Sequence, residues 1–219
     1  MFIDSNIQSA PGWGSHVQSD GSDVGGWDPA VYTIDQTFPP SCRFFLQGTK
    51  KQGSLPTVDW YIARPVQANT GNLQLNFSLT PNTNLLNNYL FETDCKLSID
   101  EYTYNFSLQV LVGSWKLEIS NQKGDWVDTG FTVPPFVPGV ATQYELVYRF
   151  NTTTKLYSIL TASIGGQAFE IPSSLGNLTA IKTGWTDTLI QMQRSLTEEA
   201  GDANQSASDQ LDACELIWS

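Results

Sequence analysis

The feature that most constrains this chain is a succession of short segments in which apolar and polar residues alternate. Alternation with a period of two is the pattern of a half-buried β-strand, and clusters of Gly, Pro, Asn and Asp separate the segments as turns do. About a dozen strands at this spacing predict an all-β jelly roll or sandwich of two antiparallel sheets. Representative segments are CRFFLQG, VDWYIARPV, NLQLNFSLTP, YLFETDCKLSI, YTYNFSLQVLV, QYELVYRFN, LYSILTASIGG and LIQMQRSL.

We predict a single β-sandwich domain over residues 1–219, because no repeat of fixed period and no linker interrupts the strand pattern. Residues 1–40 are rich in Gly, Ser, Asp and Trp, and we expect them to wrap over one edge of the sandwich. Residues 42–218 are expected to supply the strands, and the closing segment LDACELIW is expected in the middle of a sheet. The polar residues 197–209 are predicted to form a loop insert.

Charge and hydropathy narrow the function classes. The net charge of −11 and the isoelectric point near 4.3 disfavour binding to phosphate backbones, so we expect no nucleic-acid partner. No run of about 18 apolar residues is present, so we expect no membrane insertion. The first residues lack the basic and apolar regions of a signal peptide. The Asn-, Ser-, Thr- and aromatic-rich composition nevertheless predicts an extracellular or periplasmic protein, and the oligomeric state stays open.

The three cysteines are Cys42, Cys95 and Cys214. An odd number leaves at least one without a partner, and two of the three lie in strand-like segments. Cysteine is among the most frequently buried residue types, so we expect buried free thiols, with a disulfide as the alternative. No Cys-x-x-Cys motif is present to suggest a zinc or redox site.

In FETDCKL (residues 91–97), the apolar residues Phe91, Cys95 and Leu97 alternate with charged ones. Successive side chains of a strand point to opposite faces, so this apolar set should enter the core. The opposite face then carries a charged row that we expect to be open to solvent. Its members are Glu92, Asp94 and Lys96.

The same parity argument extends this row onto neighbouring strands. It predicts Gln109 in YNFSLQVLV, and Gln191 and Gln193 in LIQMQRSL, on the same open face. In VDWYIARP, the pattern leaves open which face looks into the groove. The predicted ligand-binding residues are Glu92, Asp94, Lys96, Gln109, Gln191, Gln193, Trp60 and Arg64.

The order of these elements resembles the concanavalin A-like lectin and glucanase superfamily over residues 42–218. The resemblance is carried by CRFFLQG, VDWYIARP, LQLNFSLTP, YLFETDCKL, the Trp-bearing hairpin SWKLEIS–DWVDTGF and LDACELIW. The chain is similar to single-domain bacterial members of unknown role. The resemblance implies a concanavalin A-like jelly roll with a curved groove on one sheet.

The resemblance also implies a carbohydrate-related function, in one of two forms. The first is a lectin-like domain that binds a poly- or oligosaccharide in the concave groove. The second is a glycoside hydrolase or polysaccharide lyase that acts through the Glu92/Asp94 strand or through a set of Arg, Gln and Tyr residues. A structural or interaction domain without a sugar ligand is the third hypothesis.

The catalytic hypothesis turns on a missing carboxylate. Similar hydrolases carry Glu-x-Asp-x-(x)-Glu, in which Glu92 and Asp94 match the first two positions. Lys96 and Leu97 stand at the two spacings of the third position, whereas a retaining glycosidase needs two carboxyls about 5–5.5 Å apart. Lys96 should also lower the pKa of neighbouring carboxyls, the wrong direction for a general acid. The carboxylates that other strands offer instead include Glu118 and Glu145.

A structural calcium ion is a further implication of the resemblance. Similar proteins hold calcium between N-terminal loop carbonyls and an aspartate on the last strand, where Asp212 is the matching residue. Carbonyls of residues 20–26 could complete the six to eight oxygen ligands that calcium takes. The alternative is that Asp212 caps a strand or pairs with a basic residue.

Overall fold

The computed structural model describes residues 1–18, 28–36, 41–49, 57–65, 70–81, 88–121, 124–184, 188–196 and 205–219. These residues form two antiparallel β-sheets, called sheet A and sheet B. Sheet A follows the order β13 (Gln167–Glu170), β12 (Leu156–Ile164), β11 (Thr142–Asn151), β6 (Thr70–Pro81), β17 (Gln205–Trp218), β4 (Cys42–Thr49) and β3 (Asp28–Asp35). Off this path, β1 (Phe2–Asp4) pairs with β17, and β14 (Leu178–Thr179) pairs with β12.

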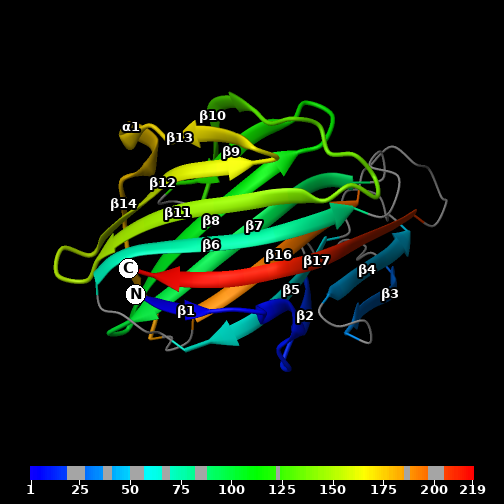
Figure 1. Ribbon diagram of the computed structural model, residues 1–219, viewed down its shortest axis with the longest axis horizontal. Helices are drawn as coiled ribbons and strands as arrows, with labels where there is room; N and C mark the ends of the chain where they lie inside the picture. The colour runs from blue at the N-terminus through cyan, green and yellow to red at the C-terminus, as the bar shows by residue number, and fades with distance from the viewer. Residues whose placement is uncertain are drawn as a thin grey trace.

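Sheet B carries the candidate site. Its order is β10 (Trp126–Thr132), β9 (Lys116–Ser120), β8 (Tyr102–Leu111), β7 (Asn88–Ile99), β16 (Thr188–Leu196), β5 (Thr57–Arg64) and β2 (Gly14–Gln18), with β15 (Ile181–Lys182) paired to β8. The described helical segments are only α1 (Ser173–Gly176) and a 3-10 turn, η1 (Ile7–Ser9). Figure 1 shows β6, β11 and β17 of sheet A lying across β7, β8 and β16 of sheet B. The prediction of an all-β jelly-roll sandwich is confirmed.

The core lies between the two sheets and follows the alternation in the sequence. Along β11, Tyr144, Leu146, Tyr148 and Phe150 are buried, and the residues between them are mostly exposed. Aromatic rings join the layers, because Tyr148 stacks on Phe106 of β8 with ring centroids 4.5 Å apart. Each large apolar side chain that is fully buried contributes roughly 1.5–3 kcal/mol to folding.

The thiol prediction is confirmed. Cys42, Cys95 and Cys214 are all buried and free of disulfides. Burial raises the pKa of the Cys42 thiol to about 12, so this thiol stays protonated at neutral pH. The cysteines therefore serve as core residues.

The N-terminal prediction is wrong in part, because the first forty residues contribute strands. β2 forms an edge of sheet B, β3 forms an edge of sheet A, and β1 pairs with β17. The physical reason is that backbone N–H and C=O groups beside an open sheet edge are satisfied by adding a strand to it. Residues 19–27 and 37–40 lie outside the described residues.

The C-terminal prediction is partly confirmed. β17 lies between β6 and β4, so LDACELIW does occupy the interior of a sheet. The loop insert predicted at residues 197–209 overlaps the start of this strand, since β17 begins at Gln205. Pairing of Gln205 to Asp209 with β4 extends the strand through these polar residues. Residues 197–204 lie outside the described part of the chain.

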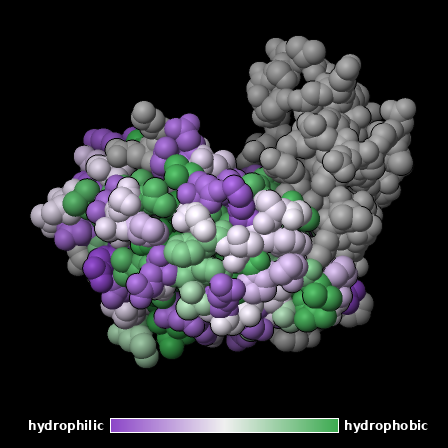
Figure 2. Space-filling model, turned by 90° about the horizontal axis from the view of Figure 1, so that it is seen from above, coloured by the Kyte–Doolittle hydropathy of each residue, from purple (hydrophilic) through white to green (hydrophobic). Residues whose placement is uncertain are grey.

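The described surface is mixed in character. On the face drawn in Figure 2, hydrophilic and hydrophobic residues are interspersed. Within the described ranges, no helix has the length and apolarity required to cross a membrane.

Candidate functional site

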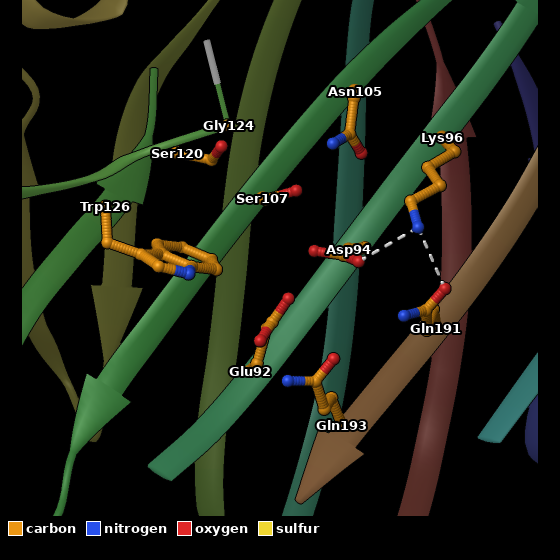
Figure 3. A pocket seen from close by; sticks show the side chains of 10 residues that line it. All are labelled: Glu92, Asp94, Lys96, Asn105, Ser107, Ser120, Gly124, Trp126, Gln191 and Gln193. Carbon is orange, nitrogen blue, oxygen red and sulfur yellow. Dashed lines mark hydrogen bonds and ion pairs between the residues drawn. The ribbon is translucent and has the colours of Figure 1, made fainter. Parts of the chain in front are cut away.

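A pocket of about 260 Å³ opens on the outer face of sheet B. Figure 3 shows its side chains converging from neighbouring strands of that sheet. β7 supplies the charged residues, β8 and β16 supply amides and a hydroxyl, and the β9–β10 hairpin closes one side. The lining residues are Glu92, Asp94, Lys96, Asn105, Ser107, Ser120, Gly124, Trp126, Gln191 and Gln193.

Strand register aligns these residues in rows across the sheet. Glu92 lies opposite Gln109 on one side and Gln193 on the other. Asp94 lies between Ser107 and Gln191 in the next row. Neighbouring strands are about 4.8 Å apart, so side chains in one row reach one another. The predicted face is therefore confirmed for β7, β8 and β16.

The prediction that the row is open to solvent is wrong. Only 7% of Glu92 and 2% of Asp94 is exposed. The reason is crowding, because long amides from both adjacent strands pack beside these two short rows. Lys96 is less buried, with 29% of its side chain exposed. The carboxyls thus form the floor of the pocket rather than a solvated ridge.

The pKa of Glu92 is raised to about 9, and burial is the largest cause. The charges of Asp94 and Asp59 and a hydrogen bond with Asp94 contribute to this rise, while Lys96 opposes it. The expected effect of Lys96 has the predicted sign, but it is smaller than the desolvation that disfavours the charged carboxylate. Glu92 is therefore protonated at neutral pH.

Lys96 is held on one side of Asp94. Its Nζ lies 3.3 Å from Asp94 Oδ2 and donates a hydrogen bond of 3.0 Å to Gln191 Oε1. Figure 3 shows that Glu92 and Trp126 lie on the other side of the Asp94 carboxylate. The ammonium is thus directed at Oδ2 and leaves Oδ1 facing away from it.

Gln109 lies beside the pocket rather than in its lining. Its Nε2 donates a hydrogen bond of 2.6 Å to Glu118 Oε2 on β9. The Glu118 carboxyl is thus held near the site by Gln109, but it does not line the pocket. Glu118 is two strands away from Glu92, with Gln109 between them in register.

The prediction that Trp60 binds ligand does not fit its position. Trp60 is only 1% exposed, and its ring stacks on Phe44 of sheet A at a centroid distance of 5.0 Å. Within β5, Val58, Trp60 and Ile62 point into the core, so the pattern in VDWYIARP belongs to the inner face. Trp60 is a core residue.

Arg64 is also outside the pocket. It shares the parity of Trp60, and at the end of β5 its guanidinium reaches Asp4 of β1. Nε and Nη2 donate hydrogen bonds of 2.6 and 2.7 Å to the two carboxylate oxygens of Asp4. This bidentate pair ties the N-terminal strand to sheet B and leaves Arg64 with a structural role.

Trp126, Ser120 and Gly124 belong to the pocket but were missed by the sequence prediction. Gly124 adopts a φ of 85°, and its N–H donates to the carbonyl of Asn121, which turns the chain from β9 into β10. Trp126 then pairs with Ser120 beside the pocket. The available signal was the pair of tryptophans around SNQKG. Its other member, Trp115, packs on Phe136 instead.

Asp212 is engaged by hydrogen-bond donors. Gln210 Nε2 donates to both carboxylate oxygens, at 3.3 and 3.0 Å, and the Ser41 hydroxyl donates to Oδ1. These donors would have to move before a cation could bind, and the described residues hold no group of three or more His, Cys, Asp or Glu side chains suited to a metal. Residues 20–26, whose carbonyls were expected to complete the site, lie outside the described residues.

The calcium site at Asp212 stays a prediction. If calcium is bound, excess EDTA should lower the melting temperature and added calcium should restore it, because a ligand stabilises the state that binds it. Thermal unfolding with and without EDTA makes the measurement. Equal melting temperatures would rule out the site.

The buried position of Glu92 predicts a pH-dependent stability. The unfolded chain ionises Glu92 near 4.5 and the folded chain near 9. Between these values the folded state holds a proton that the unfolded state releases, so the free energy of unfolding falls as pH rises, by up to about 1.4 kcal/mol per pH unit. Glu92→Gln removes this titration, and its amide can donate to Asp94. As pH rises from 5 to 8, the free energy of unfolding of the variant should increase by at least about 2 kcal/mol relative to that of the unmodified protein.

Urea unfolding of both proteins at several pH values measures this difference. Parallel stability curves for the two proteins would show that Glu92 ionises in the folded state as it does in the unfolded chain.

Solved structures with the same architecture decide the fold. A GH16 protein of a mixed linkage glucan PUL from Bacteroides ovatus, in complex with its G4G4G3G product, superposes with a TM-score of 0.55 and 10% identity, covering 99% of both chains. This chain has the concanavalin A-like jelly-roll fold. A glycosyl hydrolase family protein from Mycobacterium fortuitum shares the jelly roll with a TM-score of 0.52 and 10% identity, covering 99% of this chain and 98% of that one. No protein-family model and no curated protein matches this jelly-roll sequence.

Proposed function

We propose that this protein binds a polysaccharide across the outer face of sheet B and cleaves a glycosidic bond there, with Glu92 as the proton donor. The observation that carries the proposal is the buried Glu92 carboxyl at the floor of the pocket, where burial is the largest cause that raises its pKa to about 9. A general acid must hold its proton at the working pH and release it to the leaving oxygen. A raised pKa at a buried carboxyl in a cleft is a feature of such sites.

The other pocket residues support a sugar ligand. Trp126 offers an aromatic ring to the apolar face of a sugar, and Gln191 and Gln193 offer amides to its hydroxyls. The Asp94 carboxylate can stabilise the positive charge that develops on the sugar ring during glycoside cleavage. The two jelly-roll proteins above are described as glycoside hydrolases, which supports an enzyme at least as well as a lectin.

A second candidate, binding without cleavage, is favoured by Lys96. This lysine occupies a position at which similar hydrolases carry their second glutamate, and it is ion-paired with Asp94. Retaining hydrolysis needs two carboxyls on either side of the bond, about 5–5.5 Å apart. A lectin-like protein needs only the polar floor and the tryptophan.

A polysaccharide panel separates the two candidates. The purified protein is incubated with neutral, acidic and amino polysaccharides, and new chain ends and bound protein are measured on the same samples. New chain ends from one polysaccharide class support cleavage, and retention without new ends supports the lectin-like function. If the protein is retained by no polymer and produces no new chain ends from any of them, a carbohydrate function is refuted. A polysaccharide target also underlies our proposal of an extracellular or periplasmic location.

A further inference from the structure

The outer face of sheet B carries a surplus of carboxyl groups. Strand register places Asp59, Gln193, Glu92, Gln109, Glu118 and Asp128 in one continuous row from β5 to β10. On β7 and β9, the two lysines of this face are already ion-paired: Lys96 with Asp94, and Lys116 with Asp128 at 2.6 Å. On β7 and β9 of this face a ligand therefore meets carboxyl groups and no unpaired ammonium group, within a chain whose net charge is −11.

Buried acceptor atoms without donors lie at the centre of this face. Asp94 Oδ1, Asn105 Oδ1 and Gln109 Oε1 have no hydrogen-bond partner within the described part of the chain. Asp94 and Gln109 are 2% and 3% exposed, so solvent contact does not compensate them well. A buried acceptor without a donor costs about 1–3 kcal/mol, and native structures keep such atoms where a ligand or water completes them.

The position of Lys96 leaves room for a second cation. Lys96 contacts Asp94 Oδ2 from the side of Gln191, and Oδ1 faces Glu92 instead. An ammonium group carries three N–H donors and no acceptor, so it can donate to Asp94 Oδ1 and to one oxygen of the Glu92 carboxyl at once.

We infer that the polysaccharide recognised by this site contains amino sugars with free, charged amines, and that one ammonium group binds between Glu92 and Asp94. The inference rests on the proposed function and names its substrate class. Trp126 lies on the same side of Asp94 as Glu92, and its ring offers a face to the cation and to the sugar that carries it. The Glu92 carboxyl accepts from the ammonium through one oxygen and keeps its proton on the other, so it can still act as the proton donor.

Other sugar classes fit the site less well. A uronate carboxylate would need cationic donors, and it would meet the carboxyl groups of Asp94 and Asp59 instead. Hydroxyl groups of a neutral sugar can donate to Asp94 Oδ1, but they bring no charge to balance the carboxyls. An N-acetylated amino sugar loses the charge and adds a carbonyl acceptor next to existing acceptors.

Calorimetric titration with defined oligosaccharides tests the inference. The probes are β-1,4-linked oligomers of glucosamine, N-acetylglucosamine, glucose and mannuronate of equal length, at about pH 6, below the ordinary pKa of an amine. We expect the glucosamine oligomer to bind at least tenfold more tightly than the other three. Asp94→Asn should reduce this preference to threefold or less.

A matched control guards against unspecific attraction of a polycation. Glu145 is exposed on β11 of sheet A, so Glu145→Gln removes the same charge far from the pocket and should keep the tenfold preference. Equal losses in the Asp94 and Glu145 variants would overturn the inference, as would equal or tighter binding of any other oligomer. The comparison of four oligomers on the unmodified protein holds even if Asp94→Asn fails to fold. Tight binding of glucose or mannuronate oligomers alone refutes the amino sugar but keeps the proposed function, and absence of all binding refutes both.

Discussion

Replacing Glu92 with glutamine is expected to lower the rate of polysaccharide cleavage by about 10²–10⁴-fold, the usual contribution of a positioned general acid. Glutamine matches glutamate in size and can donate to Asp94, but it has no proton to give to a leaving oxygen. The fold should survive, because the buried carboxyl is already neutral in the folded state at neutral pH. The measurement is the initial rate of new chain ends on the best polysaccharide of the panel.

The pH profile of the unmodified protein provides an independent check. Cleavage should persist through neutral pH and decline as pH rises through about 9, where Glu92 loses its proton. Glu145→Gln serves as the matched control and should retain the full rate. A Glu92→Gln protein that cleaves at the original rate would exclude Glu92 as the proton donor.

Replacing Trp60 with alanine is expected to destabilise the fold by about 3–5 kcal/mol, as for other fully buried large aromatic residues. Trp60 is 1% exposed and stacks on Phe44 of the opposite sheet, so its removal opens a cavity between the two layers. Urea unfolding measures the loss. The result would distinguish a core tryptophan from a ligand-binding one.

Trp126→Ala is the matched variant at the pocket. Trp126 is partly exposed at the start of β10, so its removal should change the free energy of unfolding by no more than about 1 kcal/mol. Polysaccharide binding should weaken instead, since the stacking surface is lost. The assignment of the two tryptophans fails if Trp60→Ala weakens binding at unchanged stability while Trp126→Ala unfolds the protein.

The strands and the face of the site follow from local patterns in the sequence. Alternation in FETDCKL and LIQMQRSL places Glu92 and Gln191 on the outer face, because a residue's parity along a strand is a local property. The same logic places Tyr104 and Phe106 of β8 in the core, where the structure has them. The jelly-roll architecture follows because many such strands with short turns can bury their apolar faces only by stacking two sheets.

Properties that depend on several strands at once were harder to predict. The depth of Glu92 depends on amides from β8 and β16, and the direction of its pKa shift depends on that depth. The role of Arg64 depends on Asp4, sixty residues away in the chain. For Trp60, alternation marks two faces of β5 but does not say which one meets sheet A. Such contacts are set by tertiary packing, which local periodicity does not record.

The position of β17 has a consequence for how the chain folds during synthesis. β17 is the last described strand, yet it lies between β6 and β4 and also pairs with β1. Until the ribosome has released residues 205–218, β4 and β6 each lack a neighbour and present open hydrogen-bonding edges. Sheet A is therefore completed only after translation of β17, through contacts of high sequence separation that form slowly. A nascent chain that stalls before this strand is exposed to aggregation through the unpaired edges of β4 and β6.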